Sequence, residues 1–349
     1  MTDQDNVQEI LAAIAKRRDA RRHFLKVAGS STAAVGGLAL LSACGGGDDS
    51  PSPTPTPTPT GTATPTPTPT TGNTDFEVLN FALNLEYLEA QFYSYAVSGA
   101  GLSIDLTRSG SGGAPGTVTG GAQVDFSGDP LVAAYAREIA QDEVDHVRFL
   151  RLAIGATAVA MPNINISGDA TGPFTAAARF AGVVGAAGVF NPYASPENFL
   201  LGAFIFEDVG VTAYKGATPL ITSKAYLEAA GGILAAEAYH AGLVRTALYA
   251  KGIDALRTNA NLISDARDKL DGVTGATAER DQGITNADGS ANLVPADANA
   301  IAYSRTPSQV LNIVYLNTAA ATAGASAGGF FPNGLNGNLA AFKTSAANP

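Results

Sequence analysis

Cysteine is nearly absent from this sequence of 349 residues, which has one cysteine, three histidines and no tryptophan. A disulfide needs two cysteines, so none can form within one chain, and cysteine-based zinc and iron–sulfur sites are excluded as well. The single Cys44 ends an apolar stretch, where lipid attachment explains it better than a free thiol does.

Basic residues are also scarce. After residue 44 the chain has 15 Lys and Arg against 27 Asp and Glu, a formal charge of −12. This balance argues against nucleic acid as a partner and against binding of an anionic membrane through basic patches. The acids are compatible with a solvated surface or with the capture of cations.

The first 44 residues have the features of an export signal in the usual order. Arg21 and Arg22 form a twin-arginine pattern, an uncharged stretch of about 15 residues follows, and LSAC, ending at Cys44, resembles a bacterial lipobox. The stretch is short for a transmembrane helix but suits a signal peptide. We predict a twin-arginine lipoprotein signal in 1–44, and a protein held in the cell envelope, on the periplasmic side, by a lipid at Cys44. An uncleaved N-terminal anchor helix is the alternative.

A linker is predicted for residues 45–73. Proline alternates with threonine and serine in SPSPTPTPTPTGTATPTPTPTT, which prevents helix and sheet and favours extended polyproline II. At about 3.1 Å per residue, such a stretch reaches roughly 70 Å. It is typical of a stalk that holds a domain away from a membrane.

Four long helices are predicted from the period of the apolar residues. Their approximate ranges are 75–97, 129–155, 195–215 and 223–250. The second and third each begin with a capping residue followed by proline. The Gly/Ser-rich insert between the first two helices is predicted to be an exposed loop. The longer connection between the second and third can span a bundle, so these two helices are predicted to run parallel.

The fold class predicted is therefore all-α, a four-helix bundle in residues 74–252 with a long crossover. Residues 253–349 are predicted to form an extension that packs on the bundle. Weaker helices are expected at 174–185, 259–270 and 307–316.

Each long helix has a glutamate in its apolar stripe, where a lone buried carboxylate would cost several kcal/mol. The four are Glu86, Glu143, Glu207 and Glu237. His146 and His240 each follow a glutamate by three residues, in EVDH and EAYH, and residues at i and i+3 share a helix face. One Glu from each of two helices with Glu-x-x-His from the other two is the di-iron or di-manganese carboxylate pattern.

A resemblance to the ferritin-like superfamily follows from these motifs. The segments that carry it are LNFALNLEYLEAQFY, DEVDHVRFL, FIFEDVG and EAYH, with SRTPSQVLNIVYLN downstream. The chain is most similar to exported bacterial ferritin-like proteins related to plant desiccation-related proteins. The resemblance implies Glu86, Glu143, His146, Glu207, Glu237 and His240 as ligands of two metal ions, iron or manganese, with zinc fitting the same donors.

Other residues around the predicted site leave alternatives open. Glu86 is favoured over Glu89 because it precedes Tyr93 by seven residues, as Glu207 precedes Tyr214. Glu89 is then a second ligand or a residue at the rim. Both tyrosines are assigned to the surroundings of the site, where core packing is the simpler interpretation.

Asp142 is assigned the role of accepting the outer N–H of a ligating histidine, with a solvated position as the alternative. A structural bundle whose acids pair with arginine is disfavoured. The arginines near the site on the second and fourth helices are predicted to face outward: Arg137, Arg148, Arg151 and Arg245.

The function predicted is a di-metal oxidoreductase of peroxidase, catalase or ferroxidase type, with O2 or peroxide as substrate. The alternative is a metal-binding or desiccation-protective envelope protein without turnover. The resemblance is compatible with a homodimer.

Overall fold

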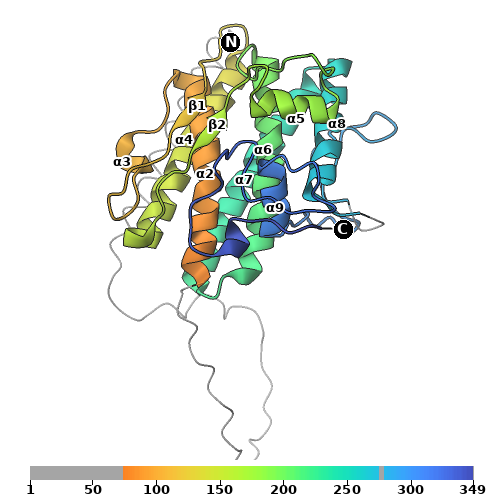
Figure 1. Ribbon diagram of the computed structural model, residues 1–349. Helices are drawn as coiled ribbons and strands as arrows, with labels where there is room; N and C mark the ends of the chain where they lie inside the picture. Colours follow the sequence, from red (N-terminus) through yellow and green to blue (C-terminus); the bar gives the residue numbers. More distant parts are fainter. Residues whose placement is uncertain (1–73, 275–278, 349) are drawn as a thin grey trace, which may run out of the picture. The chain divides into compact units, whose positions relative to one another are not determined.

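The computed structural model describes residues 74–274 and 279–348 (Figure 1). The predicted signal in 1–44, with Cys44, and the predicted linker in 45–73 lie outside these residues. Within them, no helix is both long enough and apolar enough to cross a membrane.

Four long helices form the predicted bundle. They are α2 (Thr74–Ser98), α4 (Pro130–Ile154), α6 (Pro196–Ala217) and α7 (Lys224–Ala250). The most extensive packing joins α2 to α4 and α6 to α7. Figure 1 shows α4 and α6 running in the same direction, as the long crossover predicted. The all-α fold class is confirmed.

The two capped starts follow from their local chemistry. Asp129 accepts a hydrogen bond from the amide of Val132, and Ser195 accepts one from the amide of Asn198. Each cap is followed by proline at the first helical position, where its missing N–H costs nothing. These contacts fix where α4 and α6 begin and therefore which faces their glutamates occupy.

The Gly/Ser-rich insert between α2 and α4 is mostly an exposed loop, as predicted, but it contains a strand, β1 (Val118–Gly120), that was missed. A short helix, α3 (Ile104–Thr107), precedes the insert. Strand β1 pairs in parallel with β2 (Ile164–Ile166) of the crossover. A three-residue strand has too little alternation to be seen in a Gly-rich sequence.

The crossover and the extension add shorter helices. These are α5 (Pro173–Ala181), α8 (Asp254–Asp271) and α9 (Pro307–Val314), with 3-10 turns at Gly155–Thr157, Thr218–Leu220 and Ala340–Phe342. Helix α8 begins five residues earlier than predicted, because its N-cap, Ile253, makes no side-chain capping bond that would mark the start. Helix α9 begins with a capping box between Thr306 and Gln309.

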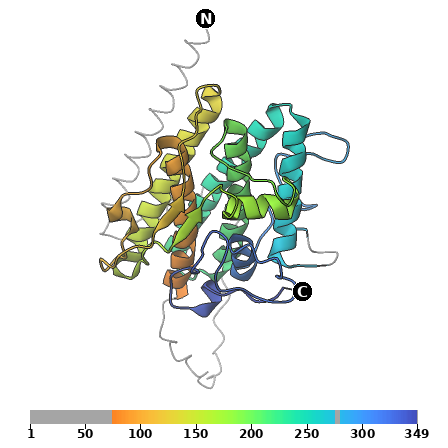
Figure 2. The same ribbon diagram turned by 45° about the horizontal axis from the view of Figure 1, so that its top comes forward.

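The extension lies against the α6–α7 side of the bundle. In Figures 1 and 2, α2 and α4 lie to one side, and α8 lies beyond α6 and α7 on the other. Helices α8 and α9 contact each other and α6. The ring of Phe330 makes edge contacts with Phe174 and Phe206 at centroid distances of 5.1 and 5.0 Å. The bundle and the extension therefore share one hydrophobic core.

Candidate metal centre

Each helix of the bundle places one glutamate in the same part of the interior. Glu86 comes from α2, Glu143 from α4, Glu207 from α6 and Glu237 from α7, and none is more than 1% exposed. Four ionised carboxylates cannot remain this close in a water-free interior without protons or cations to balance them.

The two histidines point into the same cluster. Nδ1 of His146 lies 3.2 Å from Oε2 of Glu86, and Nδ1 of His240 lies 3.0 Å from Oε1 of Glu143. The ring centroids of the two histidines are 6.1 Å apart. The structure thus brings all six predicted ligand residues together.

The ligand atoms form two overlapping groups, in each of which they lie within 4.8 Å of one another. One group is Glu86, Glu143, His146 and Glu237, and the other is Glu143, Glu207, Glu237 and His240. Glu143 and Glu237 belong to both, so they are placed to bridge two ions. Each ion would also receive one terminal glutamate and one histidine.

Unpartnered atoms show that these residues fit two cations. Both oxygens of Glu143 and of Glu237, Oε2 of Glu207 and Nδ1 of His240 are buried and make no well-directed hydrogen bond in the described part of the chain, so Nδ1 of His240 and Oε1 of Glu143 meet only as a close charged contact. Buried polar atoms in native proteins are normally satisfied. Carboxylate with imidazole is a donor set for iron, manganese or zinc.

Two tyrosines hold the terminal glutamates across the bundle. The hydroxyl of Tyr93 on α2 donates to Oε1 of Glu207 on α6, and the hydroxyl of Tyr214 on α6 donates to Oε1 of Glu86 on α2. Each tyrosine therefore fixes one carboxylate oxygen and leaves the other directed at the cluster. The equal spacing of seven residues did not predict that each tyrosine binds the glutamate of the other helix, and core packing alone is an incomplete description of the two side chains.

Asp142 contacts the outer side of a histidine, as predicted. Its Oδ2 lies 3.3 Å from Nε2 of His240, while Nδ1 of His240 faces the glutamates. A carboxylate on Nε2 fixes the ring orientation and makes the imidazole a more basic ligand.

Burial raises the pKa of three carboxyls in the metal-free protein. It raises the pKa of Glu86 to about 7 and that of Glu207 to about 8. Burial, together with the charge of neighbouring carboxylates, raises the pKa of Glu237 well above its usual value. Without metal, the cluster therefore stays compact by retaining protons, and metal uptake must displace them.

The histidines supply positive charge to the same cluster. Burial alone would lower the pKa of His240, but the carboxylates of Asp142 and Glu143 beside its two ring nitrogens outweigh it and raise that pKa to about 10. Burial would likewise lower the pKa of His146, but the charges of Glu86 and Glu143 outweigh burial and raise that pKa well above its usual value. Burial raises the pKa of Glu143, but the charge of His146 more than reverses this and lowers it. Glu143 is therefore the ionised partner of both rings.

Glu89 is buried beside the cluster rather than at its rim, and it belongs to neither group of four. Burial and the charges of Glu143 and Glu207 raise its pKa well above the usual value. Glu89 therefore adds a fifth carboxylate close to the site, but in this geometry it is not placed to hold an ion.

Gly210 is a functional position that the sequence did not reveal. A Cβ atom at this residue would lie 2.3 Å from Oε2 of Glu237 and 3.5 Å from Oε1 of Glu89. The missing side chain leaves room for the bridging carboxylate. The available signal was a glycine three residues after Glu207, in the middle of a helix, where glycine is unfavourable.

The prediction that Arg245 faces outward is wrong, because its side chain is fully buried. Its Nη1 donates to Oδ2 of Asp208 at 2.7 Å, so it neutralises the residue next to Glu207 and not a glutamate of the cluster. Arg137 and Arg148 are exposed, as predicted. None of the ion pairs found in the described residues joins an arginine to the four glutamates.

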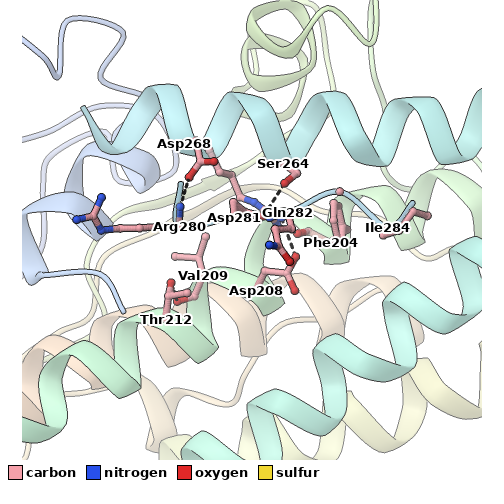
Figure 3. A network of polar contacts seen from close by, with 12 residues as sticks. Phe204, Asp208, Val209, Thr212, Ser264, Asp268, Arg280, Asp281, Gln282 and Ile284 are labelled. Atoms are coloured by element: carbon pink, nitrogen blue, oxygen red, sulfur yellow. Dashed lines mark hydrogen bonds and ion pairs between the residues drawn. The ribbon is translucent and has the colours of Figure 1, made fainter. Parts of the chain in front are cut away.

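A network of buried ion pairs continues from Asp208 into the extension. Figure 3 shows two of its carboxylates, Asp208 and Asp281, with Ser264 beside Asp281. Arg267 on α8 binds both Asp208 and Asp281, at 2.7 and 2.6 Å. Arg305 binds Asp281 at 3.3 Å and Asp271 at 3.1 Å. With Arg245, three buried guanidiniums meet three buried carboxylates. The network joins α6, α7, α8 and the segments around residues 281 and 305.

Comparison with known proteins identifies the family of this bundle. A family model described as a ferritin-like domain matches residues 74–250, about half of the chain. The chain belongs to the ferritin-like family. The ferritin-like match includes all six clustered residues.

Two curated proteins are similar over more than the ferritin-like domain. The ferritin-like catalase Nec2 of Nesocodon mauritianus is 30% identical over 284 residues, which cover 76% of this chain and 85% of that protein. The desiccation-related protein PCC13-62 of Craterostigma plantagineum is 30% identical over 258 residues, covering 68% and 76%. Both alignments are longer than the family match, so they include residues outside 74–250. The predicted resemblance to ferritin-like and desiccation-related proteins is confirmed.

Proposed function

We propose that this ferritin-like protein is a di-metal enzyme that disproportionates hydrogen peroxide, converting two H2O2 into two H2O and one O2. The observation that carries the proposal is the pair of overlapping ligand groups that share Glu143 and Glu237. Two ions held by these groups would lie side by side and would together supply the two electrons that peroxide chemistry exchanges. The similarity to a protein named a ferritin-like catalase supports the choice of reaction.

The metal ions proposed are iron or manganese, and zinc fits the donors without supplying redox chemistry. When bound, the two ions would bind peroxide and exchange two electrons with it. The chain itself keeps the ligands in place. Tyr93 and Tyr214 hold one oxygen of each terminal glutamate, and Asp142 holds Nε2 of His240. The buried surroundings keep bulk water away from the centre.

A direct test combines metal analysis with oxygen release. The purified protein, loaded with Mn(II) or Fe(II), is expected to contain about two ions per chain. A Clark electrode should then record one O2 for every two H2O2 consumed. A stoichiometrically loaded protein that releases no O2 from peroxide would contradict the proposal.

A second function is favoured by the similarity to a desiccation-related protein. In it the same centre would sequester metal without turnover and protect the cell envelope on drying. The same experiment separates the two, because this function requires metal binding but no O2 release.

We also propose that the protein is exported by the twin-arginine route and anchored through a lipid at Cys44. The support is the order of Arg21, Arg22, the apolar stretch and the LSAC motif. A clickable fatty-acid probe is expected to label the wild-type protein in the membrane fraction of a bacterial host. Cys44→Ser should abolish the label, and an unlabelled wild-type protein would contradict the anchor.

A further inference from the structure

An apolar cavity lies between α2, α6 and α9, beside the metal centre. Its walls include Leu85 and Leu88 of α2, Val209 of α6 and Val314 of α9, and Phe330 closes it from the extension. It has room for about one water-sized molecule. Helix α9 and Phe330 thus turn the groove between α2 and α6 into a chamber.

Three residues of this chamber border the metal centre directly. Glu89 and Gly210 line it, and both lie next to the carboxylate of Glu237. Tyr214 also lines it and donates a hydrogen bond to Glu86. A small molecule in the chamber is therefore close to the ligands. The side chain of Glu89 lies between them, and Gly210 contributes no side chain there.

The opposite side of the centre is polar and less closed. The side chains of His146 and Asp142 on α4 are 12% and 18% exposed, whereas that of His240 is 4% exposed. Helices α4 and α7 contact each other as little as α2 and α6 do, and much less than the tightly packed pairs. A hydrogen-bonding molecule can thus approach between α4 and α7 while keeping polar partners.

We propose that the apolar chamber is a binding site and passage for dioxygen at the metal centre. The inference rests on the proposed function, in which O2 is the product of peroxide. Hydrogen peroxide would lose hydrogen bonds in this chamber, where the polar side chains are the carboxyl of Glu89 and the hydroxyl of Tyr214, and that hydroxyl already donates to Glu86. Dioxygen makes no such bonds, so it enters without that penalty. Peroxide reaches the metals from the α4–α7 side, and O2 uses the α2–α6 side.

The first test needs neither metal nor activity. Crystals of the metal-free protein are pressurised with krypton, which occupies apolar cavities and is located by its anomalous scattering. Krypton is expected in the chamber. A second apolar cavity serves as the internal control. It is lined by Ala178, Ile263 and Leu270 and by none of the chamber residues that border the metal centre, although it shares Ile205 and Ile313 with the chamber. Krypton in the control cavity but not in the chamber would overturn the proposal.

The second test fills each cavity by the same substitution. Ala213 lines the chamber and Ala178 lines the control cavity, both in helices and both 4% exposed. Each is changed to valine in the full chain and loaded with Fe(II), and oxidation by O2 and by H2O2 is followed by stopped-flow absorbance. Ala213→Val is expected to slow the O2 reaction about tenfold and the peroxide reaction much less. Ala178→Val should change neither.

The outcomes separate this inference from the proposed function. Equal slowing of both reactions by Ala213→Val, or no slowing of either, would overturn the separate path for O2. Absence of steady-state O2 release from peroxide would overturn the enzyme proposal alone. The krypton position and the rate of Fe(II) oxidation by O2 would still decide whether the chamber admits the gas. If Ala213→Val does not fold, krypton in the wild-type crystal decides it.

Discussion

Replacing Glu237 by glutamine is expected to remove both metal ions from each chain. Glu237 belongs to both ligand groups, so a neutral amide in its place weakens both positions at once. Its pKa is raised well above normal, so the metal-free protein already holds it as a neutral acid of almost the same shape. The fold should therefore survive, which inductively coupled plasma analysis and circular dichroism would show together.

Thermal unfolding gives the size of this effect. A ligand present at 1,000 times its dissociation constant stabilises a protein by about 4 kcal/mol. For a chain of this size that corresponds to a rise in Tm of about 10 °C. The rise should be seen in the wild type on adding metal and should disappear in Glu237→Gln.

Glu138→Gln on α4 is the matched control, because Glu138 lies outside both ligand groups. It should keep two ions per chain and the full increase in Tm. If Glu237→Gln also kept both ions, the bridging position of Glu237 would be wrong.

Replacing Asp281 by alanine is expected to destabilise the protein by about 3 kcal/mol. It removes the carboxylate shared by two buried arginines and leaves Arg267 paired with Asp208 alone and Arg305 with Asp271 and Asp268. The carboxylate of Asp281 accepts from Arg267 and Arg305, which are 2% and 0% exposed. It also accepts from the hydroxyl of Ser264 at 2.8 Å. Urea unfolding of the metal-free protein would measure the loss without a contribution from ligand binding.

Asp145→Ala provides the comparison for Asp281. Asp145 pairs with Arg148 at 2.6 Å, a distance as short as that from Asp281 to Arg267, but both partners are about half exposed. An exposed pair of this kind contributes about 0–1 kcal/mol. If Asp281→Ala and Asp145→Ala lowered the free energy of unfolding by similar amounts, burial of the ion-pair network would not strengthen the packing of the extension on the bundle.

The helical faces of the site could be predicted because they are local. Residues at i and i+3 lie on one face of any α-helix, so EVDH and EAYH each direct two ligands the same way. A glutamate inside an apolar stripe must be buried with the stripe, which applies to Glu86 and Glu207 as well. Tyr93 and Tyr214 each lie seven residues, about two helical turns, after Glu86 and Glu207. Each tyrosine therefore lies on the same helix face as that glutamate.

Other features were missed because they depend on contacts between distant segments. Arg245 was placed outward since charged residues usually lie there, but Asp208 and the segment around residue 282 surround its guanidinium. The strand β1 exists only because β2 passes beside it, 46 residues later. Neither partner can be recognised from its own neighbours in the sequence.

The sequence by itself determined the class of the fold, the four long helices and the six residues that face the bundle interior, because helical periodicity and the cost of burying charge act within each segment. Only the tertiary structure decided that Glu143 and Glu237 are shared between two ligand groups and that Gly210 makes room for Glu237. The tertiary structure also decided that α9 and Phe330 close an apolar chamber beside the metal centre. These features arise from the packing of elements far apart in the chain, and packing distances are set by the side chains of all the elements that meet there.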